Sequence, residues 1–86
     1  MAEIPPVTIC TTTKNSADGL DRLLQSIECF ANEIVVVDSD SDDGTIEVAE
    51  KYGANVYQRE FSGFADIKRY AMEQATNDWI WQLDAD

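Results

Sequence analysis

The sequence is poor in basic residues and has no long apolar run. It contains 6 Lys and Arg residues against 17 Asp and Glu residues, which gives a formal net charge of −11 at pH 7. Attraction to phosphate groups requires a surplus of Lys and Arg, so this balance argues against sequence-independent binding of DNA, RNA or anionic membranes. No apolar run approaches the roughly 18 residues of a membrane span, so the sequence predicts no transmembrane segment.

Cysteine is also scarce, and the N-terminus lacks the basic and apolar organisation of a signal peptide. With two Cys residues the chain can form one disulfide at most. Since nothing in the first six residues suggests export, we expect a cytoplasmic chain in which Cys10 and Cys29 are buried, reduced thiols.

The length bounds the architecture. The 86 residues, of which 44% are hydrophobic and 27% charged, are enough for one small domain and are too apolar for intrinsic disorder. A chain of this size buries one thin core, so we expect marginal stability.

Strand and helix patterns alternate along the first half of the chain. β-branched residues predict a strand over residues 7–13, and the continuous apolar run at 33–38 predicts a strand that is buried on both faces. Between them, a helix over residues 18–30 is predicted, with Ser16 or Asp18 as its N-cap, from apolar residues at helical spacing: Leu20, Leu23, Leu24 and Ile27.

The second half continues the alternation. We expect a helix over residues 45–52, with Asp43 as N-cap and Gly53 as its stop, and a short strand over 55–59. A third helix over 64–75 and a fourth strand over 79–83 follow, the helix with one apolar face: Phe64, Ile67, Ala71 and Ala75. The order β-α-β-α-β-α-β predicts a Rossmann-like α/β fold, a parallel sheet of four strands with three helices on its faces.

Polar residues follow three of the predicted strands. Ligands of open parallel sheets bind at the carboxyl ends of the strands, so these residues are candidates for a site. They are Thr12, Thr13, Lys14, Asn15, Asp38, Ser39, Asp40, Asp84 and Asp86. The last two are two positions apart, and on an extended segment both carboxylates can reach one Mg²⁺ or Mn²⁺ and its phosphate ligand.

Five segments in this order resemble the start of a family 2 glycosyltransferase: residues 6–15, 33–45, 52–54, 63–64 and 79–86. The resemblance implies the N-terminal half of a GT-A fold, a nucleotide-sugar donor (a UDP-sugar is expected) and an inverting transfer assisted by a divalent metal. Within the family, the chain is most similar to bacterial enzymes that add glucose or heptose to lipopolysaccharide cores. This implies cell-envelope polysaccharide synthesis, with the full-length relatives at the inner face of the membrane.

The family's residue roles carry over to matching positions. Asp38 would contact the nucleotide base and Thr12 would line the same pocket, while Lys68 matches a basic position that approaches the nucleotide. In the family's D-x-D motif, Asp84 would meet the ribose or sugar, and Asp86 would coordinate the metal on the donor diphosphate. Two structural alternatives stay open, because Asp38 could merely cap the following turn and Lys68 could be a solvated helix residue.

The loop after the second strand departs from the family pattern. Asp40 stands where relatives usually have Gly and Asp42 where they have Thr, which places extra negative charge beside an anionic donor. Asp adopts a left-handed backbone more readily than most residues, so the turn can survive, and we count Asp40 among the donor-binding positions.

The length also departs from the family, whose general base lies after the D-x-D motif. We therefore expect residues 1–86 to be one nucleotide-sugar-binding domain that ends after that motif, has no catalytic residue of its own and is inactive alone. One alternative is a non-catalytic fragment that binds nucleotide weakly and forms a homodimer through the exposed strand 79–83. Another is a calcium-binding loop at 38–44, whose register lacks the bidentate Glu that such loops require.

Overall fold

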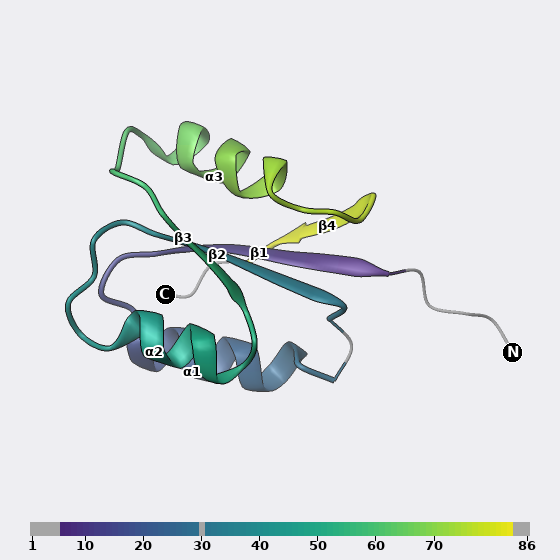
Figure 1. Ribbon diagram of the computed structural model, residues 1–86, viewed down its shortest axis with the longest axis horizontal. Helices are drawn as coiled ribbons and strands as arrows, with labels where there is room; N and C mark the ends of the chain where they lie inside the picture. The colour runs from purple at the N-terminus through teal and green to yellow at the C-terminus, as the bar shows by residue number, and fades with distance from the viewer. Residues whose placement is uncertain (1–5, 30, 84–86) are drawn as a thin grey trace, which may run out of the picture.

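The structure, a computed structural model, describes residues 6–29 and 31–83. Its elements follow in the order β1 (Val7–Thr13), α1 (Ala17–Ile27), β2 (Glu33–Asp38), α2 (Thr45–Lys51), β3 (Asn55–Gln58), α3 (Phe64–Glu73) and β4 (Trp79–Gln82) (Figure 1). The predicted alternation is confirmed, and every predicted segment overlaps the element that the structure forms.

The four strands form one parallel sheet in the order β3-β2-β1-β4. The apolar run that predicted a doubly buried strand is β2, which lies between β1 and β3. Thr13 at the end of β1 is in register with Asp38 at the end of β2, and Asp38 is in register with Gln58 at the end of β3. The carboxyl ends of these three strands therefore meet at one edge, which we call the rim.

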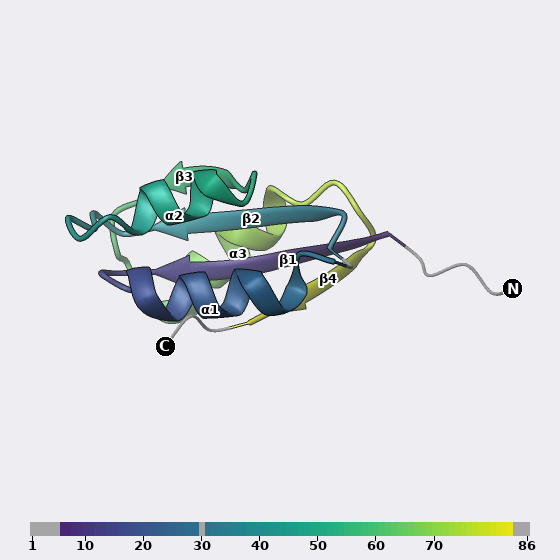
Figure 2. The ribbon, with the colours of Figure 1, turned by 90° about the horizontal axis from the view of Figure 1, so that it is seen from below.

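Helices cover both faces of the sheet. Figures 1 and 2 show α1 and α2 against one face and α3 against the other. Because side chains alternate between the faces of a strand, β1 and β2 supply both halves of the core. The half under α1 and α2 contains Ile9, Leu20, Leu24, Ile27, Ile34, Val36 and Ala49. The half under α3 contains Cys10, Val35, Val37, Ile67 and Ala71.

Several helix boundaries differ from the sequence prediction, and α3 ends at Glu73, two residues before its predicted end. α1 ends at Ile27, where the chain leaves the helix to enter β2, and the predicted end at Phe30 falls on a residue outside the described ranges. The N-cap of α2 is Gly44, with φ +91°, and not Asp43. A left-handed backbone at this position favours glycine over any residue with a Cβ, which explains the shift.

Two side chains predicted to be buried are exposed. Phe64 is 73% exposed because it occupies the first position of α3, and the residues of this helix that pack on the sheet are Ile67 and Ala71. Cys10 is a buried free thiol as expected, whereas Cys29, which follows α1, is exposed.

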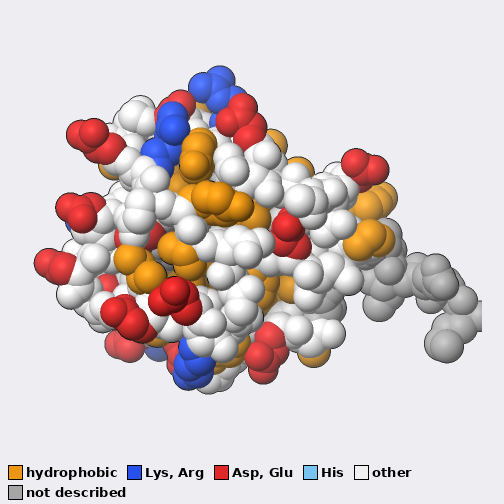
Figure 3. Space-filling model, in the orientation of Figure 1, with side chains coloured by type: hydrophobic (Ala, Val, Ile, Leu, Met, Phe, Trp, Pro, Cys, Tyr) orange, Lys and Arg blue, Asp and Glu red, His pale blue; other side chains and the backbone are white. Residues whose placement is uncertain are grey.

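β4 forms one edge of the sheet and carries apolar side chains into solvent. Trp79, Ile80 and Trp81 are 63%, 37% and 53% exposed. On the face shown in Figure 3, Asp and Glu side chains outnumber Lys and Arg and lie mostly toward the outline, with hydrophobic side chains near the centre. Within residues 6–29 and 31–83, no helix combines the length and the apolar character that crossing a membrane requires.

Candidate functional site

The loops that follow β1 and β2 form one hydrogen-bonded unit at the rim. The Ser39 backbone N–H donates to the Thr13 carbonyl at 2.9 Å, which extends the pairing of the strands. Three further bonds join the loops: Lys14 Nζ to the Asp40 carbonyl at 2.7 Å, Asn15 N–H to Ser41 Oγ at 2.7 Å and Asp42 N–H to Asn15 Oδ1 at 2.9 Å. The polar residues that the sequence placed after two different strands are thus brought together.

Asp38 is fully buried and fully hydrogen-bonded. Its Oδ1 accepts from Thr13 Oγ1 at 2.7 Å and Ser41 Oγ at 2.6 Å, and its Oδ2 accepts from the Ser41 N–H at 2.9 Å and Gln58 Nε2 at 3.2 Å. Burial raises the pKa of Asp38, but the hydrogen bonds from Ser41, Thr13 and Gln58 outweigh it and hold the pKa below its usual value. Asp38 therefore carries a stable negative charge and fixes the following turn, as the capping alternative proposed.

Asp40 occupies the left-handed position of this turn. Its φ is +59°, which confirms the expectation that Asp can replace the family's Gly here. Its side chain is exposed, and its backbone N–H donates to Gln58 Oε1 at 3.4 Å. The amide of Gln58 thus bridges the carboxylate of Asp38 and the backbone of Asp40.

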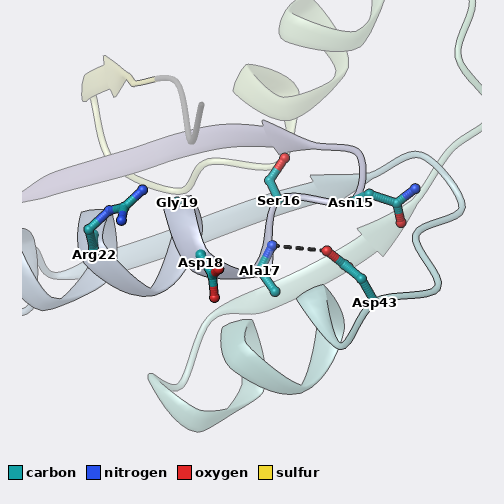
Figure 4. Close-up of a pocket in the computed structure, with 7 residues that line it drawn as sticks. All are labelled: Asn15, Ser16, Ala17, Asp18, Gly19, Arg22 and Asp43. Atoms are coloured by element: carbon teal, nitrogen blue, oxygen red, sulfur yellow. Dashed lines mark hydrogen bonds between the residues drawn. The ribbon is translucent and has the colours of Figure 1, made fainter.

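Asp43 joins the N-termini of α1 and α2. Its carboxylate accepts from the Ala17 N–H at 3.2 Å, drawn in Figure 4, and from the Thr45 N–H at 3.2 Å. Together with Asp18 it lines a hollow of about 400 Å³ at the start of α1. Arg22 lines the hollow as well, but the Asp43 carboxylate already accepts from the N-terminus of α1 and Asp18 lies beside it, so the helix end is not available to a phosphate.

A second hollow lies on the α3 side of the rim and has an aromatic wall. Phe61 and Phe64 pack edge to face with their ring centroids 5.2 Å apart. They line a space of about 520 Å³ together with Lys14, Ser39, Asp40 and Glu60. A smaller adjoining hollow shares Lys14, Ser39 and both Phe rings, and adds Thr12, Thr13 and Ile67. This size, with a largely apolar wall and a few polar groups, suits a small organic ligand.

The loop that carries Phe61 is anchored by Asp66 on α3. The Asp66 carboxylate accepts from Arg59 Nη2 at 3.0 Å, from Arg69 Nη2 at 3.2 Å and from the Ser62 hydroxyl. Arg59 also lies over the ring of Tyr70, 4.5 Å from its centroid. These contacts hold Arg59 and Ser62, which stand on either side of Phe61, against α3.

The predicted site residues fall into three groups. Thr12 and Asp40 line the hollows beside the aromatic pair, whereas the Asp38 carboxylate points to the other face of the sheet, toward Thr13. Lys68 is half-buried on α3, one turn after Phe64, and lines neither hollow. The third group, Asp84 and Asp86, lies outside the described residues.

The calcium alternative receives no support from the loop after β2. The carboxylate of Asp38 is turned inward and that of Asp43 is turned to the helix N-termini, so they do not converge. Over the part of the chain that the structure describes, no group of three or more His, Cys, Asp or Glu residues could hold a metal ion.

Sequence reasoning missed Phe61, Phe64 and Gln58. Phe64 falls at helical spacing with Ile67, a pattern that predicts a core position. The sequence signal that separates the two Phe residues is Gly63, which becomes the N-cap of α3 with φ +113°. No sequence signal marks Gln58, because its role depends on its register with Asp38.

Comparison with known proteins agrees with the architecture. An uncharacterised glycosyltransferase of Rickettsia bellii is 40% identical over 74 residues, which are 86% of this chain and 25% of that protein. The chain thus spans about a quarter of the length of this curated relative.

Among solved structures, mannosyl-3-phosphoglycerate synthase from Rubrobacter xylanophilus matches with a TM-score of 0.83 and 28% identity, over 95% of this chain and 31% of that one. Glucosyl-3-phosphoglycerate synthase from Mycobacterium tuberculosis, crystallised with Mn²⁺, uridine diphosphate and glucosyl-3-phosphoglycerate, matches with a TM-score of 0.82 and 21% identity, over 95% and 34%. The fold is that of the GT-A glycosyltransferases. The sequence model of glycosyl transferase family 2 matches residues 8–86, and the chain belongs to this family.

Proposed function

We propose that this chain is the donor-binding part of an inverting, metal-assisted glycosyltransferase that uses a nucleoside diphosphate sugar, with a UDP-sugar as the expected donor. The observation that carries the proposal is the aromatic-walled hollow of about 520 Å³ at the rim, beside the residues that follow β1 and β2. Structural neighbours crystallised with uridine diphosphate and Mn²⁺ or Mg²⁺ support the ligand class. Because the chain spans a quarter of its relative's length, the activity of the whole protein is part of the proposal.

The proposed nucleotide contacts are those of Thr12, Asp38, Asp40 and Lys68. Thr12 and Asp40 line the hollows, and Lys68 lies on α3 one turn after Phe64, which walls both of them. Asp38 contacts the base in this proposal, which requires it to give up one of the four hydrogen bonds it accepts from the chain.

The proposed metal site is the D-x-D motif, with Asp86 on the metal and Asp84 on the ribose or sugar. Carboxylate oxygens are ligands that Mg²⁺ and Mn²⁺ prefer, so the donor set fits the ion. β4 runs parallel to β1 and points to the same rim, which supports this location. A bound divalent ion neutralises the charge that develops on the departing diphosphate.

Calorimetric titration with UDP tests this proposal. We expect UDP to bind more tightly with Mn²⁺ than without it, and Asp86→Ala to remove that difference. Asp42→Ala, a change of one exposed carboxylate in the loop after β2, is the matched control and should keep the difference. Equal affinity with and without Mn²⁺ in the unaltered chain would refute the metal role.

Acceptor and location rest on the sequence resemblance alone. We propose that the full-length protein transfers glucose or heptose during lipopolysaccharide or related envelope polysaccharide synthesis at the inner face of the membrane. Residues 1–86 then form a single donor-binding domain, and by themselves bind donor without transferring sugar, since the family places its general base after the D-x-D motif. Acceptor-dependent sugar transfer by the 86-residue chain would contradict this.

Self-association is a second candidate role, favoured by the apolar edge at β4. Trp79, Ile80 and Trp81 are exposed there, and with Val7 they line an apolar hollow of about 400 Å³. An edge strand of this kind is a template for pairing with a second copy. Sedimentation equilibrium over a wide concentration range should show a dimer that Trp81→Lys abolishes. A monomer at all concentrations would exclude it.

A further inference from the structure

The carboxylate of Asp38 has no acceptor position left for a ligand. A carboxylate offers about four acceptor positions, two on each oxygen. In this structure Oδ1 accepts from Thr13 Oγ1 and Ser41 Oγ, and Oδ2 accepts from the Ser41 N–H and Gln58 Nε2. The side chain is also 0% exposed. A base can therefore reach Asp38 only if one of these donors leaves.

The hydrogen-bond donor that a ligand can displace most easily is the side-chain amide of Gln58. Thr13 is buried at the end of the central strand β1, and Ser41 makes two bonds to Asp38 and accepts a third from the Asn15 N–H. By contrast, Gln58 is exposed on the edge strand β3, and its bond to Asp38, at 3.2 Å, is the longest of the four.

The amide of Gln58 presents the hydrogen-bonding pattern of a nucleobase edge. Its Nε2 donates to the Asp38 carboxylate at 3.2 Å, and its Oε1 accepts from the Asp40 N–H at 3.4 Å. The edge of uracil has the same pair of groups, an imide N–H donor next to a carbonyl acceptor. A uracil edge in place of this amide would thus satisfy the same carboxylate and the same backbone N–H.

Space for the exchange is present on the surface. Gln58 lines a hollow of about 400 Å³ with Asp40, Arg59 and Glu60. Asp40 and Glu60 also line the hollow that Phe61 and Phe64 wall. The two hollows therefore adjoin at Asp40 and Glu60, and Gln58 lines the one without the aromatic wall.

We propose that Gln58 is a place-holder for the nucleotide base: its amide occupies the recognition position formed by the Asp38 carboxylate and the Asp40 N–H, and an incoming uracil nucleotide displaces it. The inference rests on the proposed donor-binding function and adds a specificity-determining residue to it. Because Gln58 closes the position in part of the molecules, the apparent affinity for the nucleotide is the intrinsic affinity multiplied by the fraction of molecules in which the position is open. Removing the Gln58 amide should therefore strengthen the binding of uridine nucleotides.

The test is calorimetric titration of UDP with Mn²⁺ into the 86-residue chain and its Gln58→Ala variant. Asn55→Ala, which removes another exposed amide from β3, is the matched control. We expect Gln58→Ala to bind UDP about three- to tenfold more tightly and Asn55→Ala to bind it as the unaltered chain does. The analogue 3-methyl-UDP lacks the imide N–H. Gln58→Ala should therefore bind this analogue no more tightly than the unaltered chain does.

A second measurement works without the variant. In the unaltered chain, the side-chain amide signals of Gln58 are followed in a ¹⁵N correlation spectrum. When UDP saturates the site, their chemical shifts should move toward the values of a solvent-exposed amide. UDP binding that is equal or weaker in folded Gln58→Ala, with unmoved Gln58 amide signals in the unaltered chain, would overturn the place-holder and leave donor binding intact. Absence of UDP binding to all variants would overturn both proposals.

Discussion

At the scale of single residues, buried and hydrogen-bonded carboxylates set the acid stability of the chain. Asp38 accepts four hydrogen bonds, and Glu33 accepts from Thr8 Oγ1 and from the N–H and hydroxyl of Thr76. Burial raises the pKa of each carboxyl, but these hydrogen bonds outweigh it and lower the pKa in the folded chain. Their stabilisation is present above the unfolded pKa of about 4 and is lost as pH falls through the lower folded value.

We predict that Asp38→Asn lowers the free energy of unfolding at pH 7 by about 1–3 kcal/mol, because an amide cannot accept all four donors. The free energy of unfolding of this variant should also fall less steeply with decreasing pH below about pH 4. Urea denaturation from pH 2 to 8 measures both effects. Asp42→Asn removes the same charge from an exposed position of the loop and should change neither. Equal stability of Asp38→Asn and the unaltered chain would contradict the prediction.

The two thiols should differ in reactivity. Burial, with a smaller contribution from the charge of Glu33, raises the pKa of Cys10 to about 11, whereas Cys29 is exposed. We predict that a thiol reagent modifies one group quickly in the folded chain and the second only in denaturant, and that Cys29→Ser removes the fast phase. Two fast phases in the folded chain would show that Cys10 is accessible.

At the scale of elements, helix ends depend on backbone conformation more than on contacts. Gly53 follows α2 with φ +76°, and its N–H donates to the Glu50 carbonyl at 3.0 Å. No atom lies within 4 Å of the place where a Cβ would stand. An alanine at this position therefore meets backbone strain without a steric clash.

We predict opposite effects for two Gly→Ala changes. Gly53→Ala should lower the free energy of unfolding by about 1 kcal/mol, because its backbone is left-handed. Gly19→Ala should raise it by about 0.5–1 kcal/mol, because Gly19 lies inside the helix α1. Thermal or urea denaturation of both variants is the measurement, and the same sign for both would contradict the assignment of these positions.

At the scale of the whole molecule, charge repulsion opposes the compact state. The net charge of −11 is spread over one small domain, and few basic side chains interrupt the acidic ones in Figure 3. The ion pairs of the described part are exposed or half-exposed, as in Lys51 with Asp21, so they compensate little of it.

Added salt screens the repulsion between the acidic side chains and should therefore stabilise the folded chain. We predict that the Tm rises by several degrees as NaCl increases from about 10 to 500 mM, since the Debye length shortens from about 30 Å to a few ångströms. Scans at equal protein concentration exclude an effect of dilution on any dimer. A Tm that falls with salt would show that favourable ion pairs outweigh the repulsion.

The sequence by itself determined the fold class, the order of the elements and the family. These follow from local patterns, such as the apolar run that became β2 and the helical spacing of Leu20, Leu24 and Ile27, and from motifs that stand close together in the chain. The left-handed turn at Asp40 was foreseen for the same reason, because it depends on the conformational preference of one residue.

Only the tertiary structure decided which side chains share a surface. The saturation of Asp38 by Thr13 and Gln58 and the exposure of Phe64 at the rim depend on strand register and on where α3 begins over the sheet. These contacts join residues up to 25 positions apart in the sequence. Periodicity reports which face of an element a residue occupies, but the neighbour across that face is set by the packing of whole elements.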